Sequence, residues 1–151
     1  MPTNFPTGLQ SRGIPVEGMS GIGSPLLTTG NIYHVDSGAD TADNDNAGTN
    51  PKQPLATLDG AIGKCTASNG DVILLHPGHS ETISAAAAIT FDVAGVTVIG
   101  MGVGNTRPTI TLDTATTTDI DVTAADVQIH NVIFSMNYAD IVEVFDLSAA
   151  G

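Results

Sequence analysis

The sequence is poor in positive charge. It has four Lys and Arg residues against sixteen Asp and Glu residues, which gives a formal net charge of −12 and an isoelectric point near 4.1. Proteins that bind DNA or RNA without sequence preference use Lys and Arg to neutralise phosphates, so this class is close to excluded. An anionic membrane surface would repel the chain for the same reason.

Long hydrophobic runs and cysteine are also scarce. No run approaches the roughly 18 apolar residues that a membrane-spanning helix needs. The first residues, MPTNFP, lack the positive and apolar regions of a signal peptide. Cys65 is the only cysteine, so an internal disulfide is excluded and we expect a buried, inert thiol in a helix. These features predict synthesis in a reducing cytoplasm.

Aromatic residues make up only 4% of the chain, and tryptophan is absent. The 41% of hydrophobic residues in 151 positions still suffices for one core. That core must consist mainly of Val, Ile, Leu and Ala, with many Thr residues nearby. This composition favours strands over helices.

Residues 1–30 differ from the rest of the chain in composition and in hydrophobic pattern. They hold four of the eight prolines and show no hydrophobic period of either kind. Such a segment buries too little surface by itself to offset the entropy of ordering. We predict an extended arm that becomes ordered on a partner or another subunit; the alternative is a disordered leader or a strap over its own domain. The predicted docking residues are Phe5, Leu9, Arg12, Ile14 and Val16.

Residues 31–69 are predicted to form a cap. A short alternating strand at 32–35 is followed by an acidic, Asn- and Gly-rich loop at 36–50. The apolar residues Leu55, Leu58, Ile62 and Cys65 then recur along one side of a predicted helix at 55–65. Pro54 suits the first turn of that helix.

From residue 70 onward the sequence consists of short apolar strands separated by turns. Aligning this region on itself with a shift of 31 residues places Ile89 on Ile120, Val98 on Ile129 and Ile110 on Ile141. A period of this length is typical of a solenoid, whose stacked coils share one apolar interior. The predicted strands are 72–76, 89–92, 96–99, 109–112, 119–122, 127–129, 132–134 and 141–144.

Two all-β folds fit this pattern. Hairpins favour Asn-Gly or Asp-Gly turns, and neither dipeptide occurs between the strands after Asn69. A right-handed parallel β-helix of about three coils over residues 70–151 is therefore the first choice. An antiparallel sandwich is the second.

Four segments carry a resemblance to a known family. They are residues 32–40 (IYHVDSGAD), 48–50 (GTN), 54–58 (PLATL) and 70–78 (GDVILLHPG), in that order. They resemble the opening segment of pectate-lyase-like β-helix proteins, and residues 81–83 fit the continuation. The resemblance implies a capping helix followed by the first coil. It does not decide function, because the superfamily includes lyases, hydrolases, epimerases and inert viral spikes.

The arm carries a second resemblance. Residues 4–9 (NFPTGL) and 11–16 (SRGIPV) resemble the opening of tailed-phage virion proteins that attach to a capsid or tail through an N-terminal arm. This implies a location on the capsid or tail surface, with the major capsid protein or another virion protein as partner. β-Helical viral appendages are commonly trimers, so a homotrimer is the implied assembly.

Catalytic residues are hard to assign. A pectate lyase needs an Arg base beside acidic calcium ligands, yet Arg12 lies in the arm and Arg107 in a predicted turn. A glycosidase needs two spaced carboxyl groups, and strand and turn acids are solvated by default. The available acids are Asp113, Asp119, Asp121, Asp126 and Glu143.

We therefore expect a non-enzymatic capsid decoration, cement or head-fibre protein. The alternative is a tail-spike or carbohydrate-active protein, acting as lyase or hydrolase or binding glycans without catalysis. Tyr33 and Tyr138 are the only Trp or Tyr residues on which a sugar ring could stack, which argues against that alternative.

The acidic loop partly resembles a calcium-binding loop. Residues 43–48 (DNDNAG) begin with alternating oxygen ligands, but Ala47 has no side-chain oxygen and the twelfth position is Pro54 rather than Glu. We expect a solvated loop and no cofactor; a structural Ca²⁺ ion held by Asp40, Asp43 and Asp45 is the alternative. His76, His79 and Cys65 fall short of the four ligands that zinc usually takes.

The last predicted strand, 141–144, is followed by no capping helix. An open coil leaves backbone amides and apolar side chains uncovered, which natural proteins avoid. We expect either that the chain continues or that neighbouring copies cover this end. Self-association would then add stability.

Overall fold

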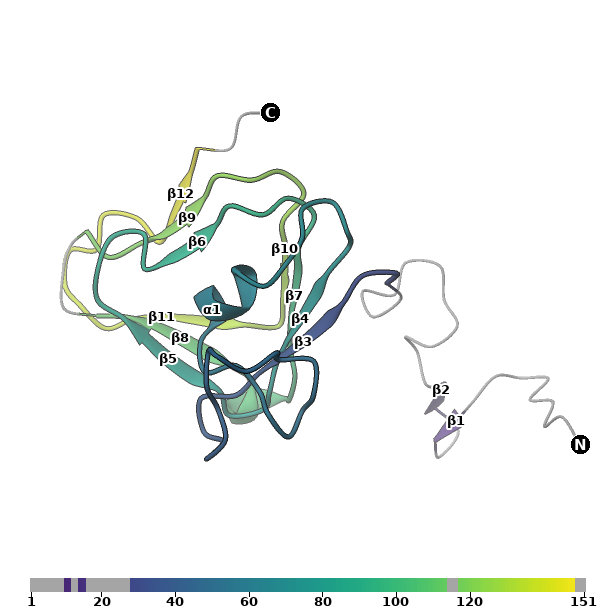
Figure 1. The fold of residues 1–151 in the computed structure, drawn as a ribbon. Helices are drawn as coiled ribbons and strands as arrows, with labels where there is room; N and C mark the ends of the chain where they lie inside the picture. Colours follow the sequence, from purple (N-terminus) through teal and green to yellow (C-terminus); the bar gives the residue numbers. More distant parts are fainter. Residues whose placement is uncertain (1–9, 12–13, 16–27, 114–116, 149–151) are drawn as a thin grey trace, which may run out of the picture.

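The computed structural model describes residues 10–11, 14–15, 28–113 and 117–148 (Figure 1). Of the predicted docking residues, Phe5, Leu9, Arg12 and Val16 lie outside this part. Ile14 belongs to β2 (Ile14–Pro15), which pairs antiparallel with β1 (Gln10–Ser11). In the described segments no helix combines the length and apolar character needed to cross a membrane.

Most strands belong to three parallel sheets (Figure 1). The first sheet has the order β3 (Ile32–Val35), β4 (Val72–Leu75), β7 (Thr97–Gly100) and β10 (Gln128–His130). The second has β5 (Ser80–Ile83), β8 (Thr109–Leu112) and β11 (Ile133–Met136). The third has β6 (Ile89–Phe91), β9 (Ile120–Val122) and β12 (Phe145–Leu147). Every pairing in them is parallel, so the antiparallel sandwich is wrong.

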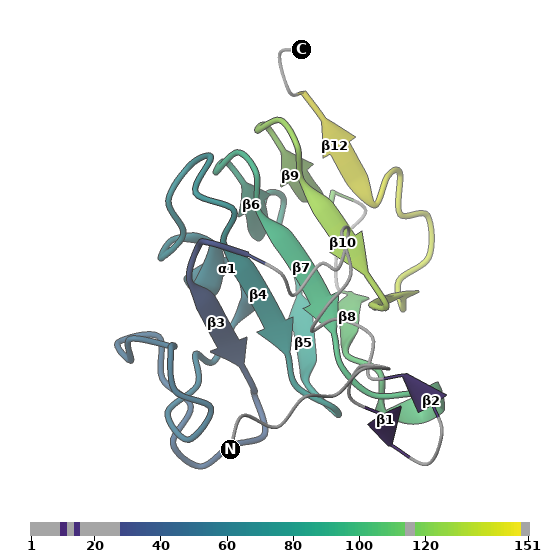
Figure 2. The same ribbon diagram turned by 90° about the vertical axis from the view of Figure 1, so that its right-hand side faces the viewer.

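The chain visits the three sheets repeatedly in one order. We call β4, β5 and β6 the first rung, β7, β8 and β9 the second, and β10, β11 and β12 the third. Each rung takes one strand from each sheet, and each strand pairs with its counterpart in the next rung. Figure 1 looks along this stack, and Figure 2 shows it from the side.

The register confirms part of the predicted repeat. Ile89 pairs with Ile120, and Val98 pairs with Ile129, as the shift of 31 residues predicts. The predicted match of Ile110 with Ile141 is wrong, because Ile110 pairs with Phe134.

The cause is the length of one turn. Residues 101–108 separate β7 from β8, whereas only residues 131–132 separate β10 from β11. Asn131 makes this tight turn with a left-handed φ of 57°, and its side-chain amide donates to the carbonyl oxygens of Gly100 and Gly102 at 2.8 and 3.0 Å. The third rung is therefore shortened. The strand predicted at 141–144 is wrong as well, since these residues precede β12.

The core fills the space between the three sheets. Alternate residues of each strand point into it, as the two-residue period of strands requires. The fully buried residues of the first two rungs include Ile73, Leu75, Ile89, Phe91, Val98, Ile110, Leu112 and Ile120.

The helix α1 (Leu58–Ile62) lies at the β3 end of the stack and buries Leu58, Ala61 and Ile62. The predicted helix at 55–65 is thus wrong at both ends. The amide of Leu55 donates to the carbonyl of His34 at 2.8 Å, and its carbonyl accepts from the amide of Asp36 at 3.0 Å. Because this pairing uses the backbone of Leu55 in an extended conformation, the helix cannot begin before Thr57, its N-cap.

Candidate functional site

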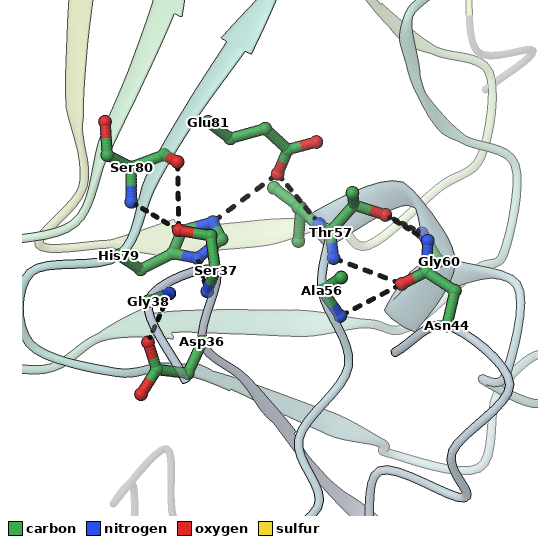
Figure 3. A network of polar contacts seen from close by, with 11 residues as sticks. Asp36, Ser37, Gly38, Asn44, Ala56, Thr57, Gly60, His79, Ser80 and Glu81 are labelled. Atoms are coloured by element: carbon green, nitrogen blue, oxygen red, sulfur yellow. Dashed lines mark hydrogen bonds and ion pairs between the residues drawn. The ribbon is translucent and has the colours of Figure 1, made fainter. Parts of the chain in front are cut away.

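A network of polar side chains joins the first rung to the segment before it (Figure 3). We call it the cap network; it comprises Ser37, Asn44, Thr57, His79, Ser80 and Glu81. His79 follows the Pro77-Gly78 turn, and its side chain is fully buried. The backbone N–H of Ser37 donates to Nδ1 of His79 at 3.0 Å. Nδ1 is therefore an acceptor, so a neutral His79 carries its proton on Nε2.

Glu81 faces both His79 and the helix. It lies on β5 two residues before the buried Ile83, so its side chain points to the interior. Its Oε2 accepts from the backbone N–H of Leu58 at 2.9 Å and lies 3.4 Å from Nε2 of His79. The Nε2 contact is an electrostatic one, because it lacks the alignment of a hydrogen bond. Glu81 thus ties β5 to the start of α1.

Ser37 does not have the surroundings of a nucleophile. Its hydroxyl donates to the carbonyl of Ser80 at 2.9 Å and accepts from the amide of Ser80 at 3.0 Å. An activated serine instead donates to a general base such as an imidazole. Here the imidazole of His79 binds the backbone amide of Ser37, so the pair holds two loops together.

Asn44 organises the acidic loop in the same manner. Its Oδ1 accepts from the amides of Ala56 and Thr57 at 3.0 and 3.1 Å, and its Nδ2 donates to the Thr57 hydroxyl at 2.9 Å. Asp43 accepts from the amide of Asp45 at 2.9 Å. In the part of the chain that the structure describes, no three His, Cys, Asp or Glu side chains are placed to hold a metal ion, and this includes Asp40, Asp43 and Asp45.

Asp71, from the Gly-Asp motif, is a fully buried carboxylate. Its Oδ1 accepts from the amide of Asn31 at 2.6 Å and from the side-chain amide of Asn69 at 2.7 Å. Its Oδ2 accepts from the amide of Thr66 at 2.7 Å. A Cβ atom on Gly30 would lie 2.6 Å from Oδ1, so the close approach of the chain before β3 requires glycine there. The motif therefore has a structural role in joining three segments.

A second polar cluster lies on the outer face of the first sheet. Nδ1 of His34 lies 3.0 Å from Nε2 of His76, and Nδ1 of His76 lies 3.6 Å from Oδ2 of Asp36. Burial is the larger cause and the neighbouring His76 the smaller cause that lower the pKa of His34 below its usual 6.5. The sequence drew attention to His76 only as a possible zinc ligand beside His79 and Cys65. The structure pairs it with His34 instead, because β3 and β4 are neighbours.

Cys65 lies beyond the end of α1 and is half-buried. Its thiol donates to the carbonyl of Ala61 at 3.3 Å. Burial, with a smaller effect of Asp71, raises the pKa of the Cys65 thiol to about 12. Such a thiol is a poor nucleophile and a poor metal ligand at neutral pH.

Most of the Arg, Asp and Glu residues that the sequence offers for catalysis make separate contacts and do not form one site. Asp119 accepts from the amide of Ala87 at 2.6 Å, and Arg107 donates through Nε to the carbonyl of Gly104 at 3.3 Å. Asp126 lies in a turn with φ of 57°, and Glu143 lies in the connection before β12. Asp113 accepts from the side-chain amide of Asn137 at 3.5 Å.

Asp121 and Asp146 are brought together. They are in register on β9 and β12, and both point away from the core. Partial desolvation, then the carboxylates of Asp119 and Asp146, raise the pKa of Asp121. Asp121 is among the acids that the sequence offers for catalysis, and Asp146 is not, because the predicted strand 141–144 ends before β12 begins.

No protein-family model matches this chain, and neither a curated protein nor a solved structure matches it.

Proposed function

We propose that the chain forms a right-handed parallel β-helix and serves as a non-enzymatic structural protein of a tailed-phage virion, of the capsid decoration or head-fibre type. The repeated order of the three sheets supports the β-helix. In such a fold each coil adds one strand to each sheet, and the inward side chains stack in columns.

One observation carries the structural role. The side chains of Ser37, Asn44, His79, Glu81 and Asp71 all bind backbone groups of neighbouring segments. The Ser37 hydroxyl donates to a carbonyl and not to a base. They join the segment before the first rung, the helix and the first rung into one unit. A catalytic site keeps its polar atoms available for a substrate.

The resemblance of residues 4–16 to virion attachment arms supports the virion assignment. The arm would dock on the major capsid protein or another virion protein through Phe5, Leu9, Arg12, Ile14 and Val16. The acidic composition fits the exterior of a particle, where net charge favours solubility. A homotrimer is the proposed assembly.

The test is attachment to particles. Phe5, Leu9 and Ile14 would be replaced together by Asp in the full chain, and the variant would be incubated with virions that lack this protein and then sedimented. We expect the variant to stay in the supernatant with an unchanged circular dichroism spectrum. The matched control is Val103→Asp, at an exposed apolar residue outside the arm, which should still sediment. Equal sedimentation of the arm variant and the original chain would refute the proposal.

Asp121 and Asp146 favour one alternative, a tail-spike or other carbohydrate-active protein. Neighbouring strands of a sheet lie about 4.8 Å apart, and retaining glycosidases hold their two carboxyl groups at about 5–5.5 Å. Release of reducing sugar from an acidic polysaccharide, and its loss in Asp121→Asn, would support this alternative.

A further inference from the structure

Two histidines meet on the outer face of the first sheet, the face turned toward the viewer in Figure 2. His34 lies on β3 between the buried Tyr33 and Val35, so its side chain points outward. His76 follows the buried Leu75 at the end of β4 and points outward in the same way. Nδ1 of His34 and Nε2 of His76 are 3.0 Å apart, and both residues are partly exposed to solvent.

The backbones of both histidines are fixed by hydrogen bonds. The amide of His34 donates to the carbonyl of Gly48 at 2.8 Å, and its carbonyl accepts from the amide of Leu55 at 2.8 Å. The amide of His76 donates to the carbonyl of Val35 at 2.9 Å. The two strands are also paired in register. Two ligands on paired strands are held in place before an ion arrives, which lowers the cost of binding it.

Asp36 orients the ring of His76. Its Oδ1 accepts from the amide of Gly38 at 3.0 Å (Figure 3), and its Oδ2 lies 3.6 Å from Nδ1 of His76. A carboxylate beside Nδ1 favours the tautomer with the proton on that nitrogen, so the lone pair is on Nε2 and faces His34. Histidines that bind metal ions commonly have such a carboxylate beside their other ring nitrogen.

The spacing of the two facing nitrogens suits a metal ion. An ion with bonds of about 2.0 Å to two imidazoles holds their nitrogens about 2.8 Å apart at a right angle and about 3.3 Å apart at a tetrahedral angle. The observed 3.0 Å lies between these values, and the ring planes are inclined by 82°, so the rings do not stack. Without an ion, Nδ1 of His34 donates its proton to Nε2 of His76. With an ion in place, His34 would carry that proton on its own Nε2 instead.

The donor atoms indicate which ions can bind. Imidazole nitrogen suits Cu²⁺, Ni²⁺ and Zn²⁺, whereas Mg²⁺ and Ca²⁺ prefer oxygen ligands. Among the residues that the structure describes, no third His, Cys, Asp or Glu side chain completes a metal site, so the remaining positions would be left to water. For a given set of nitrogen ligands, Cu²⁺ binds more tightly than Ni²⁺ or Zn²⁺. The net charge of −12 attracts cations to the chain as a whole.

We infer that His34 and His76 together bind one divalent transition-metal ion, with Cu²⁺ bound most tightly, and that Asp36 positions His76 for it. The ion would link β3 to β4 and so fasten the segment before the first rung to that rung. This inference goes beyond the proposed function, because it concerns the outer face of the first sheet and needs neither the arm nor a particle.

Calorimetric titration tests the site. The full chain, without an affinity tag and freed of metal by a chelator, would be titrated with Cu²⁺ near neutral pH. We expect one tightly bound ion per chain, at least about tenfold weaker binding of Zn²⁺, and no competition from excess Mg²⁺. Electron paramagnetic resonance of the Cu²⁺ complex should show coupling to two imidazole nitrogens.

Histidine variants locate the ion. His34→Gln and His76→Gln should each weaken Cu²⁺ binding at least about tenfold and leave coupling to one imidazole nitrogen. The matched control is His130→Gln, at an exposed histidine of the same sheet, which should bind Cu²⁺ as the original chain does. Cu²⁺ should raise the midpoint of thermal unfolding of the original chain and of the control, but not that of His76→Gln.

Asp36→Asn tests the positioning role. The amide keeps an oxygen for the backbone N–H of Gly38 but lacks the charge that favours the proton on Nδ1 of His76. Cu²⁺ binding should weaken about tenfold while coupling to two imidazole nitrogens remains. Unchanged affinity in this variant would remove Asp36 from the inference.

Three results would overturn the site itself. The first is the absence of tight Cu²⁺ binding. The second is binding that excess Mg²⁺ displaces or that both His34→Gln and His76→Gln leave unchanged, which would place the ion on carboxylates. The third is an equal loss of affinity in His130→Gln, which would mean that exposed histidines bind ions singly. Because none of these experiments uses virions, their failure is distinct from failure of the proposed attachment.

Discussion

Leu112 and Met136 occupy neighbouring, in-register positions on β8 and β11, yet the Leu112 side chain is fully buried whereas 61% of Met136 is exposed. The two side chains are close in size and lie at equivalent positions of the second sheet. Replacing each by Ala therefore compares the effect of a buried side chain with that of an exposed one. Leu112→Ala should lower the free energy of unfolding by about 2–5 kcal/mol, because it leaves a cavity.

Met136→Ala is the matched control for this prediction. An exposed substitution should change the free energy of unfolding by no more than about 0.5 kcal/mol. Urea denaturation followed by circular dichroism measures both variants. Similar losses in the two would mean that the third rung is covered in solution.

The buried carboxylate of Asp71 supports a second prediction. Asp71→Ala removes the acceptor for the amides of Asn31 and Thr66 and for the side chain of Asn69. We expect a loss of at least about 2 kcal/mol in the free energy of unfolding, since buried donors are left unsatisfied. The exposed Asp92 provides the control, and Asp92→Ala should be close to neutral in the same urea titration. Equal effects of the two substitutions would contradict the role given to the motif.

The N-cap of α1 gives a third prediction. The Thr57 hydroxyl accepts from the amide of Gly60 at 3.1 Å and from Nδ2 of Asn44 at 2.9 Å. Thr57→Ala should cost about 1 kcal/mol of stability, whereas Thr57→Ser keeps the oxygen and should recover most of it. Thermal unfolding of the three proteins at one concentration would reveal this order. A Ser variant as unstable as the Ala variant would show that the hydroxyl does not act as a cap.

The repeat could be predicted from the sequence because it depends on local alternation. Ile89 and Ile120 are both apolar because both point into the core. They pair on neighbouring rungs, so the sequence repeats the apolar position after 31 residues. The match ends at Ile110, because the two-residue turn at Asn131 shortens the third rung. Asn131 has a left-handed backbone conformation, and its side-chain amide donates to the carbonyls of Gly100 and Gly102. A periodic pattern of apolar residues does not reveal such hydrogen bonds.

The cap network could not be predicted. Ser37 and His79 are 42 positions apart, and Glu81 and Leu58 are 23 apart. The motifs that contain Asp71 and His79 were visible, but the partners of these side chains follow from the pairing of β3 with β4. The predicted start of the helix is wrong for a similar reason, since hydrogen bonds to His34 and Asp36 hold the backbone of Leu55 in an extended conformation.

Cys65 gives a chemical prediction. Its pKa of about 12, against an ordinary 9.0, leaves roughly a thousandfold less thiolate at pH 8. Alkylation by iodoacetamide should therefore be slower by about that factor in the folded chain than in urea. Mass spectrometry of the alkylated fraction over time gives both rates. A folded rate within about tenfold of the rate in urea would contradict this prediction.

The contact between His34 and His76 predicts a dependence of stability on pH. Burial and the neighbouring His76 lower the pKa of His34 in the folded chain below the ordinary value of 6.5. As the pH falls through 6.5, the unfolded chain takes up a proton on His34 that the folded chain resists, so the free energy of unfolding decreases. His34→Gln removes this difference and should flatten the decrease. His130→Gln, at an exposed residue of β10, is the control and should retain the slope of the original chain. Urea titrations at several pH values on either side of 6.5 supply the comparison. If the His34 variant loses stability with acidification as steeply as the control, the His34–His76 contact does not oppose protonation of His34.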